Sequence, residues 1–140
     1  MSYSSLLKTV GLKNTKIRSN ILQLLLENLK PCSAAEMLKL LKIKGIQPNK
    51  TTVYRELEVL LAKGIIKEVF VNGKVRYFEV TEARHHHHLI CLKCNKMIDF
   101  TPAAEIEATV KRLAKKLAAK NKYQLVDHSL EFFGLCPNCK

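Results

Sequence analysis

The chain has 140 residues, of which 47% are apolar and 26% charged, and its formal net charge is +12. This length allows one domain or two small ones, and the apolar content is enough for packed cores. The sequence contains no run of 18 apolar residues and begins without a signal-peptide pattern, so we expect a cytosolic protein without a membrane segment. Residues 1–83 carry a net charge of +7 and residues 84–140 a net charge of +5, which suggests a polyanionic partner without locating its site.

Three helices are predicted in the first half of the chain. The first covers residues 13–28, where apolar side chains recur at helical spacing and Thr15 can cap the first turn. The second covers residues 33–45, and the third runs from Asn49 to Gly64. In each case a residue that favours a helix end follows the last apolar position of the pattern.

The periodicity changes to that of β-strands after the third helix. Residues 65–71 and 74–80 form two strand patterns, and Asn72-Gly73 between them is typical of a type I′ turn. Three helices followed by a two-stranded hairpin predict a winged helix-turn-helix. We therefore expect a DNA-binding domain over residues 1–83 and a second domain over residues 84–140.

The exposed face of the predicted third helix carries hydroxyl and guanidinium groups that suit base edges and phosphates. Basic residues also lie at the start of the first helix. The candidate DNA-binding residues are Lys13, Lys16, Arg18, Thr51, Thr52, Tyr54 and Arg55. Glu58 lies on the same face and would repel phosphate, so we assign it no contact. The alternative is a three-helix bundle with a hairpin and no role in nucleic-acid binding.

The second domain begins with a stretch from His85 to Cys94 that holds four imidazoles and two thiols. We predict a strand over residues 85–92 and an antiparallel return over residues 96–100. Thr101-Pro102 then resembles a helix start with an N-cap and a first-turn proline. The following helix is expected to bury Ile106, Val110, Leu113 and Leu117, and residues 123–135 are expected to form a last strand that contains His128.

Two Cys-x-x-Cys pairs, Cys91/Cys94 and Cys136/Cys139, are separated by 41 residues. Structural disulfides are unusual in cytosolic chains, whereas four thiolates from two tight turns suit a tetrahedral Cys₄ zinc site. A redox-active pair is the alternative. A domain of about 55 residues is small enough for a bound metal to supply much of its stability.

The four consecutive histidines can serve two separate sites. Because the side chains of a strand alternate between its faces, His85 and His87 would point one way and His86 and His88 the other. Further nitrogen and oxygen ligands are available elsewhere, and this donor set suits Zn²⁺, Fe²⁺ or Mn²⁺ in a reversible site. These further candidates are Glu79, Asp99, Glu105, Glu107 and His128. An expression tag is the alternative for the four histidines, and a structural strand histidine is the alternative for His128.

Over nearly its whole length, the chain resembles the ferric uptake regulator (Fur) family of metal-responsive bacterial repressors. The matching motifs are Gly11-Leu12-Lys13-x-Thr15-x-x-Arg18, Thr52-Val53-Tyr54-Arg55 with Leu57, His85-His86-His87-His88-Leu89-Ile90-Cys91-x-x-Cys94, His128-Ser129-Leu130 and Cys136-x-x-Cys139. The resemblance implies an α+β fold, with an N-terminal winged helix-turn-helix followed by a small α/β dimerisation domain that contains the Cys₄ zinc site. It also implies a homodimer that binds double-stranded DNA at an AT-rich pseudo-palindromic operator.

The resemblance further implies three metal sites. Structural Zn²⁺ would be held by Cys91, Cys94, Cys136 and Cys139. The regulatory site would bind Fe²⁺ or Zn²⁺, or Mn²⁺ in vitro, through Glu79, His86, His88 and Asp99. The additional site would consist of His85, His87 and His128 with either Glu105 or Glu107.

Two positions depart from the family pattern. Many members supply a histidine just before the second helix, where this chain has Pro31-Cys32, and many have Asp at the position of His87. Whether Cys32 replaces the missing ligand, and which metal is sensed, stay open at this point. The alternatives are a peroxide-sensing member of the family, a metal-independent DNA-binding protein, and a zinc hydrolase. We expect no enzyme, because the sequence contains no H-E-x-x-H or similar motif.

Overall fold

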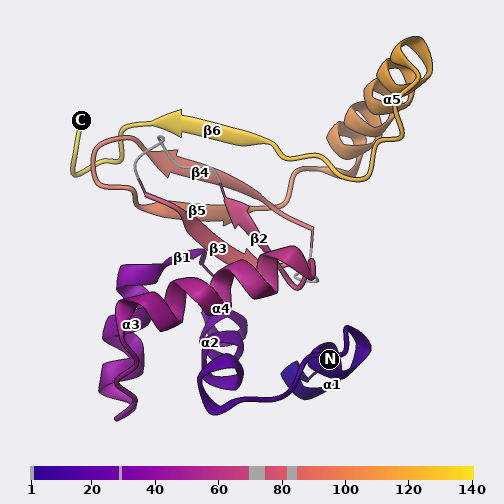
Figure 1. Ribbon diagram of the computed structural model, residues 1–140. Coiled ribbons are helices and arrows are strands. Elements are labelled where there is room, and N and C mark those ends of the chain that lie inside the picture. The colour runs from indigo at the N-terminus through magenta and orange to yellow at the C-terminus, as the bar shows by residue number, and fades with distance from the viewer. Residues whose placement is uncertain (1, 29, 70–74, 82–84) are drawn as a thin grey trace. The chain divides into compact units, whose positions relative to one another are not determined.

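The computed structural model describes residues 2–28, 30–69, 75–81 and 85–140. The chain divides into two compact units, Met1–Arg84 and His85–Lys140, each with its own three-stranded sheet (Figure 1). The predicted Asn72-Gly73 turn lies outside the described residues. Within these described ranges, no helix is both long and apolar enough to cross a membrane.

The helices of the N-terminal unit begin at capping residues that the sequence makes visible. They are α1 (Tyr3–Thr9), α2 (Lys16–Glu27), α3 (Ala34–Ile43) and α4 (Lys50–Ala62). Thr15 accepts a hydrogen bond from the backbone N–H of Arg18, and Ser33 forms a capping box with Glu36 at the start of α3. The Asn49 side chain caps α4 by accepting a hydrogen bond from the backbone N–H of Thr52. The three predicted helices are confirmed, whereas α1 was not predicted.

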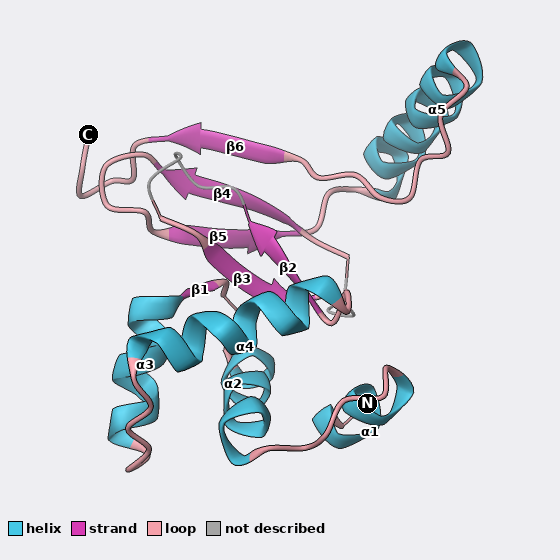
Figure 2. Ribbon diagram, viewed as in Figure 1, coloured by secondary structure: helices cyan, strands magenta, loops and turns pink. Residues whose placement is uncertain are grey.

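The sheet of the N-terminal unit consists of β1 (Cys32–Ser33), β2 (Ile66–Val69) and β3 (Tyr77–Val80), in the order β1-β3-β2 (Figure 2). The hairpin strands β2 and β3 are antiparallel, with Ile66 opposite Val80. The short strand β1 pairs with the other edge of β3 and was not predicted. The winged helix-turn-helix is therefore confirmed, with one more helix and one more strand than expected.

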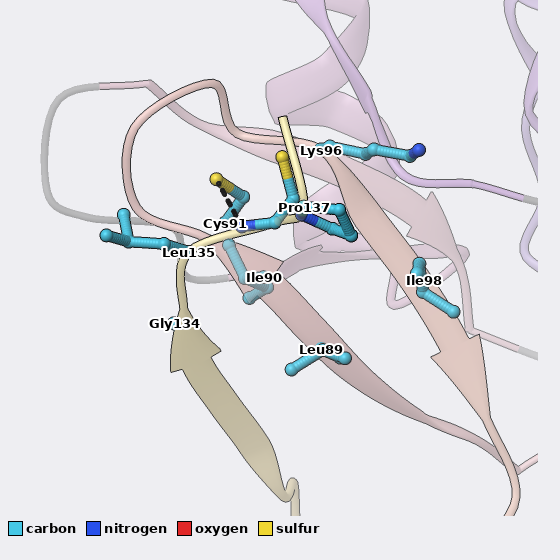
Figure 3. Close-up of a pocket in the computed structure, with 9 residues that line it drawn as sticks. Leu89, Ile90, Cys91, Lys96, Ile98, Gly134, Leu135 and Pro137 are labelled. Carbon is cyan, nitrogen blue, oxygen red and sulfur yellow. Dashed lines mark hydrogen bonds between the residues drawn. The ribbon is translucent and has the colours of Figure 1, made fainter. Parts of the chain in front are cut away.

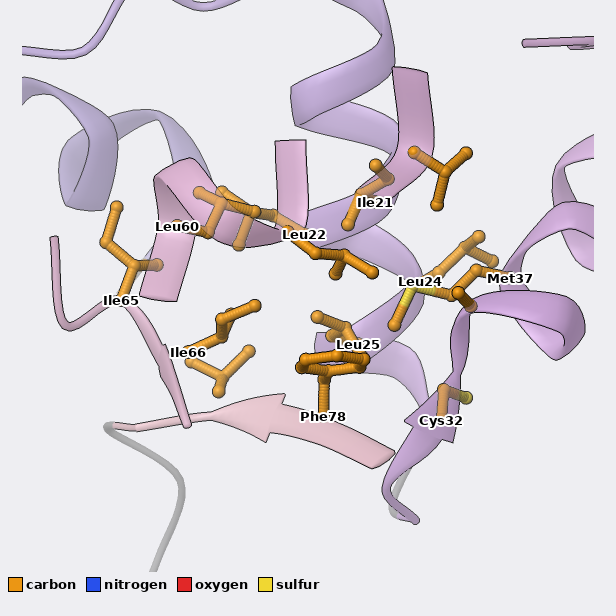
Figure 4. Packing of buried hydrophobic residues seen from close by; sticks show 14 of the residues in the cluster. Ile21, Leu22, Leu24, Leu25, Cys32, Met37, Leu60, Ile65, Ile66 and Phe78 are labelled. Carbon is orange, nitrogen blue, oxygen red and sulfur yellow. The ribbon is translucent and has the colours of Figure 1, made fainter. Parts of the chain in front are cut away.

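The core of this unit lies between its helices and one face of the sheet (Figure 4). Phe78 of β3, Leu22 of α2 and Leu57 of α4 are completely inaccessible to solvent. Burial of each such side chain stabilises the fold by about 1.5–3 kcal/mol. Val53 and Leu60 of α4 are also buried, so the opposite face of this helix is left for solvent or a ligand.

The C-terminal unit contains β4 (His87–Cys91), β5 (Met97–Phe100), α5 (Ala104–Asn121) and β6 (Glu131–Gly134). The strand order is β5-β4-β6, where β4 is antiparallel to β5 and parallel to β6. The predicted hairpin of β4 and β5 is confirmed. The last strand is shorter than predicted, and His128 lies before it rather than inside it.

Two predictions about α5 are wrong. The helix begins at Ala104, because the backbone carbonyl of Ala103 accepts the first helical hydrogen bonds and Thr101 provides no cap. No residue of α5 is buried in the single chain, and Ile106, Leu113 and Leu117 are 50%, 56% and 48% exposed. Figure 1 shows why, since α5 extends away from the sheet of its own unit.

Candidate metal centres and DNA-reading face

Four cysteines converge at one end of the C-terminal sheet. Cys91 ends β4, Cys94 lies in the turn that follows, and Cys136 and Cys139 lie in the turn after β6. Their Sγ atoms all lie within 4.8 Å of one another, and those of Cys94 and Cys136 are 3.8 Å apart. A tetrahedral zinc with Zn–S bonds of about 2.3 Å places its sulfur atoms roughly 3.8 Å apart. The cluster therefore fits a structural zinc ion, and four thiols around one point do not form two independent redox pairs.

The backbone around the cluster prepares it for a cation. N–H groups of Cys94 and then of Cys136 lower the pKa of the Cys91 thiol to about 6, and the Cys136 N–H donates to Cys91 Sγ at 3.4 Å (Figure 3). A hydrogen bond with the Cys136 thiol raises the pKa of the Cys139 thiol to about 12. One thiolate therefore forms readily, whereas the full set requires a metal that displaces the remaining protons.

The alternation of the histidines is confirmed. The rings of His85 and His87 lie with their centroids 4.8 Å apart, and those of His86 and His88 lie 5.0 Å apart. Each pair belongs to one face of the segment that enters β4. His87 and His88 belong to β4, and His85 and His86 directly precede it with their rings against those of the same pair, which the tag interpretation does not explain.

The first pair lies with Glu107 of α5 and with His128. Glu107 Oε1 lies 3.2 Å from His85 Nε2 and 2.5 Å from His87 Nε2, and Oε2 lies 3.3 Å from His128 Nε2. The hydrogen bond from His87, followed by that from His85, lowers the pKa of Glu107 to about 2, so its carboxylate is ionised. Glu105 does not belong to this group, whose carboxylate is that of Glu107.

Unsatisfied atoms show that this group suits a metal ion. Glu107 Oε2 and His128 Nε2 are buried, and beyond their mutual contact at 3.3 Å neither makes a hydrogen bond with any described residue. Buried polar atoms without partners are costly, and a divalent cation between three imidazoles and a carboxylate would satisfy both. The ligand atoms of His85, His87, Glu107 and His128 all lie within 4.8 Å of one another.

The second pair faces Asp99 on the neighbouring strand. His88 lies opposite Asp99 in the β4–β5 register, and its Nε2 atom is 3.7 Å from Asp99 Oδ1. His86 Nε2 is 4.0 Å from Asp99 Oδ2. Asp99 Oδ1 is buried without a hydrogen bond to any residue that the structure describes. These distances exceed those of hydrogen bonds and leave room for an ion between the ring nitrogens and the carboxylate.

Two remaining candidates for metal binding lie in the N-terminal unit. Glu79 is a buried residue of β3 whose Oε1 atom lies 3.2 Å from Lys67 Nζ. Cys32 of β1 packs in the hydrophobic core, where its Sγ accepts a hydrogen bond from Asn28 Nδ2 at 3.4 Å. Burial raises the pKa of this thiol, and the charge of Glu36 adds to the effect. Cys32 is thus a residue of the hydrophobic core of its unit.

Most of the predicted DNA-binding residues lie on the surface. Thr51, Tyr54 and Arg55 are exposed along one side of α4, and Lys50 Nζ lies 5.8 Å from the centre of the Tyr54 ring. Thr52 is half-buried, and its hydroxyl donates to Asn49 Oδ1 at 2.8 Å, so it supports the helix start. Lys13 and Lys16 are exposed beside the first turn of α2.

Arg18 differs from the sequence prediction. Its Nε donates to Glu56 Oε2 at 2.8 Å, its Nη2 donates to Glu56 Oε1 at 3.3 Å, and its Nη1 donates to the carbonyl of Lys13 at 2.7 Å. The two side chains are only 11% and 15% exposed. The guanidinium therefore ties α2 and the Lys13 backbone to α4 instead of facing a ligand. Glu56 was missed because no local pattern indicates a partner so far along the chain.

A winged-helix unit combined with a thiolate cluster and two imidazole–carboxylate clusters defines a metal-binding transcription regulator. The family model described as the ferric uptake regulator family matches residues 9–133. The ferric uptake regulation protein of Legionella pneumophila is 31% identical over 141 residues, which span 100% of both chains. The chain belongs to the ferric uptake regulator family of metal-responsive DNA-binding regulators.

Solved structures agree with this assignment. The Helicobacter pylori ferric uptake regulator, described with three functional metal binding sites, has a TM-score of 0.76 and 29% identity, over 97% of this chain and 87% of that chain. The Pseudomonas aeruginosa ferric uptake regulator with manganese has a TM-score of 0.77 and 28% identity, over 98% of this chain and 99% of the other. The predicted fold class and family are both confirmed.

Proposed function

We propose that the chain is a homodimeric repressor that senses Fe²⁺ or Zn²⁺ and controls genes for metal uptake and homeostasis. The observation that carries this proposal is the division of four consecutive histidines between two clusters, each with a carboxylate that has an unsatisfied buried oxygen. Two such clusters beside a separate Cys₄ site allow one ion to hold the fold while others bind and leave. The ligands of the two reversible sites are nitrogen and oxygen atoms, which suit both metals and also Mn²⁺ in vitro.

The regulatory site consists of His86, His88 and Asp99, together with Glu79 as the ligand from the N-terminal unit. The support for the first three is their geometry, and the support for Glu79 is its position in the family resemblance. A metal that joins ligands from both units would restrict how the winged helices of a dimer are spaced. Two DNA-reading helices must lie about one turn of DNA apart, or a multiple of that distance. Metal binding then raises DNA affinity by selecting the competent spacing.

The additional site consists of His85, His87, Glu107 and His128. Because Glu107 belongs to α5, an ion here would tie this helix to the start of β4. The helix has no buried residue of its own, so this attachment affects how it is presented to other molecules. We expect this site to act mainly on dimer stability.

A second copy of the chain is the partner that the C-terminal unit requires. The apolar side of α5 is exposed at Leu113 and Leu117, and isolated helices depend on packing for most of their stability. Leu89, Ile98 and Leu135 also line a shallow apolar pocket on the sheet (Figure 3). Dimerisation would cover such surfaces, as the family resemblance implies.

The operator is expected to be an AT-rich pseudo-palindrome in double-stranded DNA, read by the exposed side of α4. Thr51, Tyr54 and Arg55 would contact base edges or phosphates, and Lys13 and Lys16 would contact phosphates. The Thr52 hydroxyl is engaged with Asn49, so its contribution is to hold the start of the helix. We assign no catalytic role to any residue.

The test is a titration of DNA affinity under anaerobic conditions, with a labelled duplex selected by the protein from a random pool. The duplex affinity of the protein is measured with a chelator and with added Fe²⁺, Zn²⁺ or Mn²⁺, while retention of the structural zinc is checked by elemental analysis. We expect Fe²⁺ or Zn²⁺ to raise the duplex affinity at least tenfold. Equal affinity with chelator and with every metal, at constant zinc content, would instead indicate a metal-independent DNA-binding protein.

A further inference from the structure

Glu58 is an acidic residue on the side of α4 that the proposed function assigns to DNA. It follows Thr51 by seven positions and Arg55 by three, so the three side chains lie on one side of the helix. The Glu58 side chain is 57% exposed. An isolated carboxylate here would repel a phosphate backbone, so its surroundings decide whether this face can bind DNA.

Arg76, which directly precedes β3, supplies the partner of this carboxylate. Its Nη1 donates to Glu58 Oε1 at 2.6 Å, and its Nε and Nη2 donate to the two carboxylate oxygens of Glu68, each at 3.1 Å. Glu68 belongs to β2, opposite Phe78 in the register of the hairpin. The guanidinium carbon lies 5.2 Å from the centre of the Phe78 ring. One guanidinium therefore joins α4 to both strands of the hairpin.

The exposure of these groups indicates that the network matters little for folding. The side chains of Arg76 and Glu68 are 43% and 41% exposed, and ion pairs at such solvent-exposed sites add little to folding stability. The Arg18–Glu56 pair in the same unit is much better shielded. The main consequence of the Arg76 network is therefore local: its single positive charge offsets one of the two negative charges of Glu58 and Glu68 beside the α4 face, and its hydrogen bonds link the hairpin to that face.

We propose that Arg76 is a positioning residue for DNA recognition, which neutralises Glu58 and fixes the β2–β3 hairpin against α4. This role rests on the proposed function, in which Tyr54 and Arg55 make the direct contacts. Loss of Arg76 leaves two carboxylates without this cation beside the DNA-reading side and removes the side-chain link between the hairpin and the helix. Both effects lower DNA affinity without the loss of a direct DNA contact.

Two other roles make different predictions. If Arg76 contacted a phosphate itself, its removal would make the dependence of log affinity on log salt shallower, by about one unit of slope. If Glu58 accepted a hydrogen bond from a cytosine amino group, Glu58→Gln alone would weaken binding to the selected duplex and relax its specificity. The positioning role predicts neither result.

The experiment measures the affinity of metal-loaded, full-length protein for the selected duplex at several salt concentrations. Four variants are compared with the wild-type protein: Arg76→Ala, Glu58→Gln, the combination of both changes, and Lys44→Ala. The last is a matched control, because Lys44 forms an exposed ion pair with Glu27 elsewhere in the unit. Thermal unfolding of each variant is followed separately.

We expect Arg76→Ala to weaken binding about five- to tenfold, as two unshielded carboxylates near DNA require, with an unchanged salt slope. Glu58→Gln alone should bind within about twofold of wild type, and in combination it should restore at least half of the logarithmic loss. Additive losses, a salt slope lowered by about one unit, or a weak Glu58→Gln variant would each overturn the positioning role. Wild-type protein without metal-stimulated binding would instead reject the proposed function.

Discussion

Removal of the Arg18 guanidinium should destabilise the N-terminal unit and leave the metal clusters of the C-terminal unit intact. Arg18→Ala leaves the Glu56 carboxylate, which is 15% exposed, without its cation, and it leaves the Lys13 carbonyl without its donor. Breaking a buried ion pair by deleting one partner costs about 3–5 kcal/mol, and the residual solvent access of this pair lowers our expectation to about 3 kcal/mol. For a unit of this size, that loss lowers the unfolding midpoint by about 12–24 °C.

Thermal unfolding of metal-loaded protein, followed by NMR signals of the N-terminal core, measures this effect without interference from the other unit. The double change Arg18→Met/Glu56→Met removes both charges and keeps the volume, so it should recover most of the loss. Lys44→Ala breaks an exposed ion pair and should change the stability of the unit by less than about 1 kcal/mol.

The same variants separate a structural role of Arg18 from a direct DNA contact. Binding is measured well below the unfolding midpoint of each variant. We expect the Met/Met protein to keep its duplex affinity within about threefold, because neither side chain faces the ligand. An Arg18→Ala protein that is as stable as wild type but binds DNA tenfold more weakly would show that Arg18 contacts DNA and is not a structural residue.

Three further predictions follow from the other sites. Cys91→Ser should release the structural zinc and unfold or monomerise the C-terminal unit, whereas Cys32→Ser should retain the zinc. Elemental analysis measures the zinc content and sedimentation measures the oligomeric state. A Cys91→Ser dimer with a full complement of zinc would contradict the Cys₄ assignment. Arg55→Ala should cost about 1–3 kcal/mol of duplex binding if it reads a base, at unchanged zinc content, and an unaltered affinity would remove α4 as the reading helix. Leu113→Glu should yield monomers in sedimentation experiments. Ile43→Glu is the control and should leave the oligomeric state unchanged, because Ile43 of α3 is 81% exposed. A Leu113→Glu dimer of wild-type stability would show that α5 is not in the interface.

The features predicted well from the sequence are those that depend on neighbouring residues. Thr15 caps the helix that follows as predicted, and the helices predicted from residues 33 and 49 begin at the caps Ser33 and Asn49, because a short polar side chain reaches N–H groups only three residues away. The division of the histidines depends on strand alternation alone, so a segment of a few residues contains all the information. The helix α1 was also within reach, since Ser2 caps it in the same manner.

The features predicted poorly depend on distant contacts. Glu105 and Glu107 have the same side chain, so the sequence does not distinguish them. Only the path of α5 relative to β4 brings Glu107 to the histidines. The apolar periodicity of α5 correctly indicates a helix with one apolar side, but the pattern does not reveal whether its own sheet or another chain covers that side. Arg18 was predicted as a DNA contact from its charge, since the sequence does not show that Glu56 shields it.

The most direct test of the account compares the two faces of one strand. His86→Ala/His88→Ala removes one imidazole pair, and His85→Ala/His87→Ala removes the other, with equal chemistry and neighbouring positions. The measurement is the ratio of duplex affinity with and without the activating metal, for dimers that retain structural zinc. We expect the first double variant to lose the metal-dependent gain and the second to keep most of it, with a less stable dimer. Equal losses in both would contradict the division into two sites and indicate that the four histidines serve a single metal ion.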